Sequence, residues 1–328
     1  MRNHLRMLTL CLILAVLAGC QPSTSRQYLV VDFEPKTDLT YKFVSERQTS
    51  LEIPTAKNAT QKAKSQTQMM TEKMELVIAY NASAADEYGR STVHATCKSA
   101  KVTRKGSIAK GSPKDAVEGL AGKIFSFTIL ANGQIDEYSS LEEIVRDMAQ
   151  NMFGDPRGGR KVKNPEMISD FIAMQWYLWD SIAMIDNPQK GVKPGQTWTA
   201  KQMVPMPIPM TFAKDTTYTL TEINDSETGP MAVIDSTFQR SEVPAENTPN
   251  IYTGQKFTLK GIFVLLRNYR LLSFQGSGKQ IFDIDRGVVA SDNQQHTMEF
   301  QVSFPMPLGD SPPKLKIEQK MTIELLND

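Results

Sequence analysis

Cysteine and histidine are both scarce in this sequence. Three residues of each type occur in the 328-residue chain, and Cys11 and Cys20 both lie within its first twenty residues. Only Cys97 is left for the remainder, so an intramolecular disulfide framework is excluded there. No C-x-x-C or H-E-x-x-H motif occurs, and His94 and His296 leave little material for a zinc site or a histidine-based catalytic triad. We therefore predict that the protein is not an enzyme and uses no cofactor.

An excess of charge of either sign is also missing. The chain carries 37 Lys and Arg against 36 Asp and Glu, which gives a net charge of +1. Nucleic-acid-binding domains normally show a clear basic excess, so we predict no nucleic-acid partner. The apolar run from Leu8 to Leu17 is shorter than the roughly 20 residues that a transmembrane helix needs.

Residues 1–19 have the three parts of an export signal. Arg2 and Arg6 give a basic start, the apolar run follows, and the small residues Ala18 and Gly19 precede Cys20. We expect this segment to be removed. The short polar stretch 20–27 would then form a tether in front of the folded body.

The sequence Leu17-Ala18-Gly19-Cys20 resembles the lipobox of bacterial lipoproteins at every position. The resemblance implies that the Cys20 thiol receives a diacylglycerol and that its new amino group is acylated with a fatty acid such as palmitate. Such chains hold a protein on a membrane without a transmembrane helix. Gln21, where an Asp could stand, favours the outer membrane of the cell envelope over the inner one. The alternative is a secretory signal that releases a soluble protein, with Cys20 present by chance.

Period-two alternation dominates the rest of the chain. In the tail 315–325, Leu315, Ile317, Met321 and Ile323 alternate with polar residues, which is typical of a strand with one solvent-facing side. The Asn-Gly pair at 132–133 predicts the turn of a hairpin. Comparable strands are predicted near 39–53, 68–80, 90–103, 124–130, 214–223, 231–240, 255–266, 269–284, 288–292 and 296–304.

Two segments in mid-chain show helical spacing instead. Residues 140–153 carry apolar side chains on one side, and residues 164–187 run from one Asn-Pro pair to another with apolar side chains on nearly all sides. We predict that the second helix is buried on the concave side of a sheet. The predicted fold class is α+β, mostly antiparallel, with a curved or half-barrel sheet similar in layout to the lipoprotein-carrier half-barrels.

The sequences on either side of these helices look alike. Residues 74–102 and 218–243 each consist of a predicted strand, a polar turn with acids and Gly, and a second strand. We infer a duplicated β unit. The predicted units are 28–163, which includes the helix at 140–153, and 188–328, with the helix at 164–187 between them.

Residues 276–302 and the stretch KPGQTWT at 193–199 resemble uncharacterised families of secreted or lipid-anchored bacterial proteins, domains of unknown function common in planctomycete-type bacteria. The resemblance implies a location and no chemistry. In physical terms, the first segment predicts a hairpin. Gly276 and Gly278 would allow a bend or bulge, Phe282 would pack inward, and Gly287 would form the turn.

Two other patterns could carry chemistry. Asp283 and Asp285 are predicted to share a strand face and could act as a carboxylate pair in an envelope hydrolase; the alternative is a polar strand face. Met203, Met206 and Met210 offer soft thioether ligands for Cu(I), or else simply fill gaps in a proline-stiffened segment.

The isolated cysteine and histidines are predicted to be structural. Cys97 shares an alternating face with Val93 and Ala95, so we predict a small buried thiol. His94 falls on the opposite phase and should face solvent. His296 is predicted to lie at the start of a strand.

Aromatic residues are most plentiful in one helix and one pair of strands. We predict an apolar pocket between Phe171, Trp176 and Trp179 on one side and Phe282, Met298 and Phe300 on the other. The sequence thus favours a lipid-anchored envelope protein that binds an apolar small molecule or an envelope protein partner. A structural or assembly component of the cell surface is the main alternative.

Overall fold

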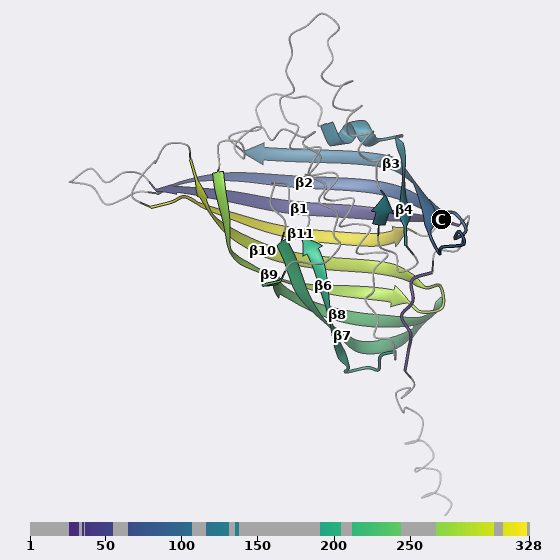
Figure 1. Cartoon of the computed structure of the whole chain (residues 1–328). Helices are drawn as coiled ribbons and strands as arrows, with labels where there is room; N and C mark the ends of the chain where they lie inside the picture. The colour runs from purple at the N-terminus through teal and green to yellow at the C-terminus, as the bar shows by residue number, and fades with distance from the viewer. Residues whose placement is uncertain are drawn as a thin grey trace, which may run out of the picture.

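The computed structural model describes residues 26–32, 35, 37–54, 65–106, 116–130, 135–137, 191–204, 212–243, 267–304 and 311–326. Most of these residues form one antiparallel sheet (Figure 1). Its strands are β1 (Asp38–Pro54), β2 (Ser65–Ala82), β3 (Ser91–Gly106), β4 (Ile124–Ile129), β5 (Ile135–Glu137), β6 (Thr197–Val204), β7 (Phe212–Ser226), β8 (Gly229–Arg240), β9 (Arg267–Asp283), β10 (Val288–Ser303) and β11 (Lys314–Leu326).

The first and the last strand lie side by side in the middle of this sheet. The strand order is β5-β4-β3-β2-β1-β11-β10-β9-β8-β7-β6. Strands that follow one another in the sequence are therefore neighbours, except that β1 pairs with β11 and that β5 and β6 occupy the two opposite edges. It follows that the chain between Glu137 and Thr197 connects one edge of the sheet to the other.

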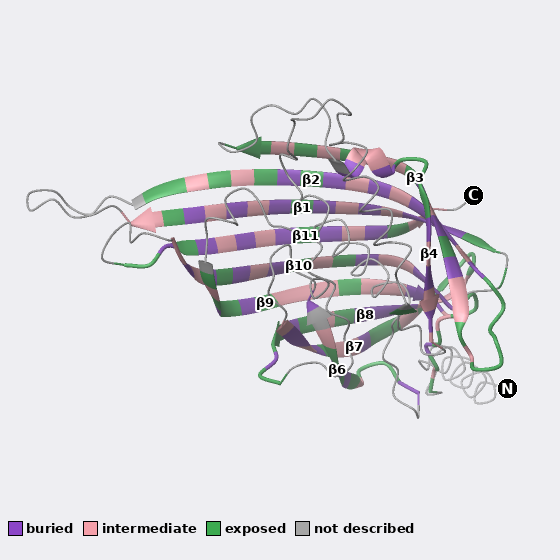
Figure 2. Ribbon diagram, turned by 45° about the horizontal axis from the view of Figure 1, so that its top comes forward, coloured by how far each residue is buried: buried purple, intermediate pink, exposed green. Residues whose placement is uncertain are grey.

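The predicted α+β class is wrong. The described residues form an open, curved antiparallel sheet, and their only helical element is the 3-10 helix η1 (Ala116–Leu120) (Figures 1 and 2). In most of the sheet, the alternation of apolar and polar residues continues over strands of 12 to 18 residues. This period of two is typical of strands and not of helices. The predicted helices at 140–153 and 164–187 lie outside the described residues. Within the part that is described, no helix has the length and apolar character to cross a membrane.

Most of the predicted strands are present. The segments predicted at 288–292 and 296–304 form the single strand β10, because its pairing with β11 continues across them. The edge strand β6 was not predicted, and the strand expected at 255–266 and the Asn-Gly turn at 132–133 lie outside the described residues. Both predicted β units contribute strands to the one sheet, while their boundaries and their duplication stay predictions.

Buried residues alternate with more exposed ones along the strands (Figure 2), so the sheet has one buried face and one solvent-facing face. In β1, Tyr41, Phe43 and Leu51 are at most 2% exposed, whereas Glu46 and Glu52, which point the other way, are exposed. This is the pattern of an antiparallel sheet that packs on a core through one face. The alternation in the sequence therefore identifies the buried face correctly.

The bulge that was one of two predictions for Gly276 and Gly278 is absent. Strand β9 pairs with both β8 and β10 through these positions without a shift in register. Gly276 is needed for another reason: a Cβ there would meet the Phe238 ring and lie 2.5 Å from the main-chain oxygen of Gln295. The missing side chain makes room for Phe238. Gly287, with φ of 65°, does form the predicted turn.

We expect Gly276→Ala to lower the free energy of unfolding by about 1–3 kcal/mol, the usual cost of overpacking. The main-chain oxygen of Gln295 is fixed by the sheet and cannot move away from the new methyl group. Gly278→Ala is the matched control, because there the nearest atom is the Ser236 hydroxyl oxygen at 2.8 Å, on a small side chain that can rotate. Urea denaturation of both variants tests this. Equal losses would contradict the explanation.

Candidate functional site

The described apolar side chains of the buried face include two separate clusters. One contains Leu51, Val204, Phe238, Leu271, Phe274, Met298, Phe300, Val302, Leu315 and Ile317. The other contains Leu29, Val192, Trp198, Leu220, Ala232, Ile234, Phe282 and Val289. Because the second cluster lies nearer the ends of the strands where β9 turns into β10, the two clusters are offset along the strand direction.

A row of polar side chains crosses the same buried face. Its members stand directly opposite one another on five adjacent strands, in the order Arg104, Glu72, Arg47, Gln319 and His296. We call these five residues the buried polar row. Neighbouring strands are about 4.8 Å apart, so the row is about 20 Å long. Four of its members are less than 9% exposed, and the Arg104 side chain is 10% exposed.

Glu72 lies between two arginines in this row. Its Oε2 accepts a hydrogen bond from Nη2 of Arg47 at 3.1 Å and also forms an ion pair with Arg104. A carboxylate between two guanidinium groups is a strong, charge-assisted arrangement. Burying it is nevertheless costly, because apolar residues of similar volume often stabilise a core as well or better. The triad is therefore a feature that stability alone does not explain.

His296 ends the row with one nitrogen unsatisfied. Gln319 donates from its Nε2 to the Ser45 hydroxyl at 3.0 Å and hydrogen-bonds to the His296 ring. Burial, together with the nearby positive charges of Lys214 and Arg47, lowers the pKa of His296 to about 3, so the ring is neutral at neutral pH. With Gln319 at Nδ1, the buried Nε2 has no hydrogen-bond partner among the described groups. A neutral ring that donates from Nδ1 presents an acceptor lone pair at Nε2.

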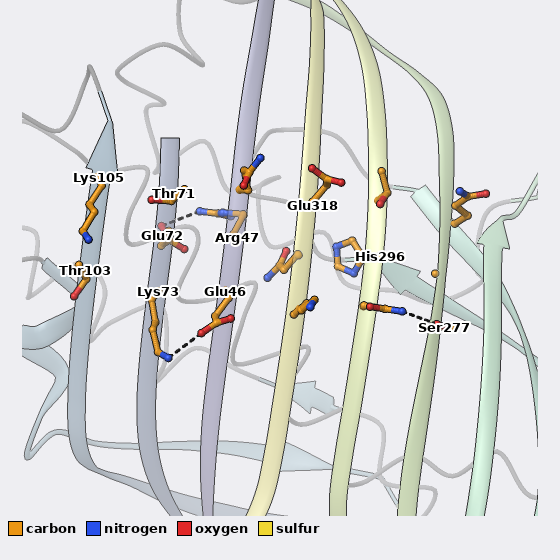
Figure 3. Close-up of a pocket in the computed structure, with 17 residues that line it drawn as sticks. Glu46, Arg47, Thr71, Glu72, Lys73, Thr103, Lys105, Ser277, His296 and Glu318 are labelled. Carbon is orange, nitrogen blue, oxygen red and sulfur yellow. Dashed lines mark hydrogen bonds and ion pairs between the residues drawn. The ribbon is translucent and has the colours of Figure 1, made fainter. Parts of the chain in front are cut away.

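The solvent-facing side of the same strands holds a shallow hollow of about 1000 Å³ (Figure 3). It extends over six adjacent strands from β3 to β9, and its lining also includes Arg47, Glu72, Gly276, His296 and Gln319 of the buried phase. The other twelve lining residues belong to the exposed face. They are Glu46, Gln48, Thr71, Lys73, Thr103, Lys105, Gln275, Ser277, Gln295, Thr297, Glu318 and Lys320. Hydrogen-bonding groups of both kinds and charges of both signs make this a polar surface.

The structure describes half of the predicted apolar pocket. Met298 and Phe300 belong to the first apolar cluster and Phe282 to the second, all on the buried face. The buried polar row, through His296, lies between Met298 and Phe282. Phe171, Trp176 and Trp179 are outside the described residues, so the pocket stays a prediction.

The predicted carboxylate pair is not on one strand. Asp283 is the last residue of β9, is buried, and accepts a hydrogen bond from the main-chain nitrogen of Arg286 at 3.0 Å. Asp285 is exposed in the following turn, beside Gly229. Asp283 therefore stabilises the turn, because its carboxylate accepts a main-chain N–H there.

The remaining predicted residues have mixed outcomes. Cys97 is fully buried, which raises the pKa of its thiol to about 11, and His94 is exposed, so both predictions are confirmed. The prediction for His296 is wrong, because this residue lies in the middle of β10. Met206, Met210 and Cys20 lie outside the described residues. Within the described part of the chain, no group of three or more His, Cys, Asp or Glu residues could hold a metal ion.

Sequence reasoning overlooked the buried polar row, although a signal for it exists. Gln319 interrupts the apolar phase of β11 between Ile317 and Met321, and Arg47 similarly occupies the buried phase of β1. When several strands each have a single polar residue in the buried phase, either the predicted buried face is wrong or these residues form a shared polar site. Only the register shows that these residues stand opposite one another.

We expect Glu72→Gln to lower the free energy of unfolding by about 3–5 kcal/mol, because it leaves two buried guanidinium groups facing a neutral amide. Glu46→Gln is the matched control on the neighbouring position of the opposite face. It removes an exposed ion pair with Lys73 (Nζ to Oε1, 2.8 Å) and should change stability little. Urea denaturation at neutral pH measures both. Comparable losses in the two variants would show that the two arginines do not depend on a buried carboxylate.

Comparison with known proteins gives one family match. Residues 87–237 are similar to DUF6263, a family of unknown function, which agrees with the predicted resemblance to uncharacterised domains. The matched range includes the stretch 193–199 but not 276–302. No curated protein matches the chain.

Two solved structures show only distant likeness. A structure described as lipid-protein interactions in lipovitellin covers 90% of this chain at 11% identity with a TM-score of 0.47, and the chain spans 26% of that protein. The structure of OpdQ from Pseudomonas aeruginosa matches 89% of this chain and 99% of its own length, at 8% identity with a TM-score of 0.17. At these TM-scores, neither likeness bears on function.

Proposed function

We propose that this protein is a non-enzymatic, lipid-anchored protein of the bacterial cell envelope that binds an apolar ligand carrying a polar group. The observation that supports ligand binding is the buried polar row between two apolar clusters on one face of the sheet. The residues around Cys20 support the anchor, because they have the order of an export signal followed by a lipobox. Attachment to the outer membrane is part of the proposal.

The buried polar row fits a ligand of mixed character. Apolar side chains on both sides of the row would contact the hydrocarbon part of the ligand, and burial of that part would supply most of the binding free energy. The polar group of the ligand would lie at His296, where Nε2 lacks a described partner. An unpaired buried acceptor costs free energy, so a hydroxyl that donates to Nε2 would be favoured. Long-chain alcohols, acylglycerols and glycolipids have this chemistry.

A structural role on the cell surface is the second candidate function. The observation that favours it is the polar hollow on the exposed face, which offers hydrogen-bonding groups over six strands to a protein partner. In that case the buried face would be filled by the chain itself. The two candidates differ in whether the purified protein carries a small molecule.

The anchor is tested by Cys20→Ser. The unaltered protein should partition into the detergent phase of a Triton X-114 extract, because its acyl chains enter micelles. The variant cannot receive the diacylglycerol and should remain in the aqueous phase or keep its signal segment. Metabolic labelling with an alkyne fatty acid gives a second readout, and label on the variant equal to that on the unaltered chain would refute the anchor.

Ligand binding is tested by native mass spectrometry of the purified protein, with organic extraction of whatever copurifies. We expect a bound compound with a hydrocarbon chain and a hydroxyl group. His296→Phe should lower the affinity for the ligand by about twofold to tenfold, the effect of one lost hydrogen bond of about 0.5–1.5 kcal/mol, and so reduce the bound fraction. His94→Phe, on the exposed side of β3, is the matched control and should retain the ligand. A protein that is always free of ligand would favour the structural role.

A further inference from the structure

The N-terminal segment 26–32 lies against one end of the sheet. Gln27 pairs with Val192 through two main-chain hydrogen bonds of 2.8 Å, and the main-chain nitrogen of Asp32 donates to the oxygen of Gly287. Leu29 is 1% exposed and belongs to the second apolar cluster. The segment is therefore held at the end of the sheet where β9 turns into β10. We call this the Gly287 end.

The outer side of this segment is unusually apolar. Leu29 points into the core, whereas Tyr28 and Val30 are 58% and 60% exposed. Arg26 is exposed on the same side, and its guanidinium donates to the oxygen of Gly191 at 3.0 Å. A cation, an aromatic ring and an aliphatic side chain thus follow one another on one exposed strip.

A second exposed aromatic residue lies at the same end of the sheet. Tyr88 is 72% exposed in the turn between β2 and β3, and the Arg90 guanidinium lies 5.3 Å from the centre of its ring. Because β3 begins and β10 begins at the same end of the antiparallel sheet, this turn and Gly287 lie at the same end.

The length of the tether decides which surface this end faces. Arg26 is the sixth residue after Cys20, and an extended chain spans at most about 3.6 Å per residue. An acylated Cys20 would therefore hold Arg26 within about 22 Å of the membrane surface. Met69 is also exposed, near the start of β2, but Ala82 at the other end of that strand is the thirteenth residue after it. That distance is about 43 Å at 3.3 Å per residue.

We propose that the Gly287 end of the sheet contacts the lipid–water interface, with Tyr28, Val30 and Tyr88 in contact with the bilayer. This inference rests on the proposed anchor at Cys20. Tyrosine favours the membrane interface because its ring is apolar and its hydroxyl remains hydrated. Acidic residues at this end, among them Asp225 and Asp285, offset Arg26 and Arg286, so attraction to anionic lipid is not the cause. We therefore expect the Gly287 end to contact a neutral phosphatidylcholine bilayer as well.

The test places an environment-sensitive fluorophore on single introduced cysteines in the full, lipidated protein. The variants are Tyr28→Cys and Tyr88→Cys, with Met69→Cys as the matched control at the opposite end. The native Cys97 is fully buried, so labelling of the unaltered protein measures the background. Circular dichroism of each variant checks that these exposed substitutions leave the fold unchanged.

The labelled proteins are reconstituted in phosphatidylcholine vesicles with and without a nitroxide-bearing lipid. We expect the labels at positions 28 and 88 to show blue-shifted emission and to lose most of their intensity to the nitroxide, while the label at 69 keeps its intensity. Protein that floats with the vesicles but whose label at 28 is quenched no more than that at 69 would overturn the orientation alone. Protein that does not float with the vesicles would overturn the anchor and the orientation together.

Discussion

The pairing of β1 with β11 is the constraint on which the rest of the structure depends. It joins the first and last strands over thirteen consecutive residue pairs, from Thr40 with Leu326 to Glu52 with Lys314. All other neighbouring strands in the sheet are also neighbours in the sequence. Without this central ladder, the sheet would separate into β1–β5 and β6–β11, and each would gain an unpaired edge. The first apolar cluster and the buried polar row both have members on β1 and β11 and depend on the register of this ladder.

The register of this pairing is what creates the candidate site. Arg47 stands opposite Gln319 across the β1–β11 ladder, and this contact connects the Arg47–Glu72 pair to His296. A slip of one residue would turn the whole buried phase of β11 toward solvent. The Arg47–Glu72 and Arg104–Glu72 ion pairs join β1, β2 and β3, so they penalise slips between those strands, where a buried charge would lose its partner. Ligand recognition and the choice of register are compatible roles for the same residues.

Local patterns in the sequence predicted the strands and their buried faces well, but not the lateral order of the strands. The alternation in the tail identifies Leu315 and Ile317 as buried, yet nothing local to the tail indicates that it lies beside β1. The site was missed for the same reason: Glu72 and His296 are isolated exceptions in their own strands, and only long-range pairing brings them into one row. Gly276 was misinterpreted because a glycine that admits a neighbouring ring and a glycine at a bulge look alike in sequence.

The proposed orientation on the membrane limits what ligand binding can mean. His296 is eight residues from Val288, where β10 begins at the Gly287 end, so the buried polar row is about 26 Å along the strand from that end. The hydrocarbon core of a bilayer is about 30 Å thick, and each leaflet contributes half of it. A lipid with its polar group at His296 would therefore be bound outside the bilayer and not within it. A protein held in this way would take its ligand out of the membrane or receive it from the aqueous side, and both actions require a face that shields hydrocarbon from water.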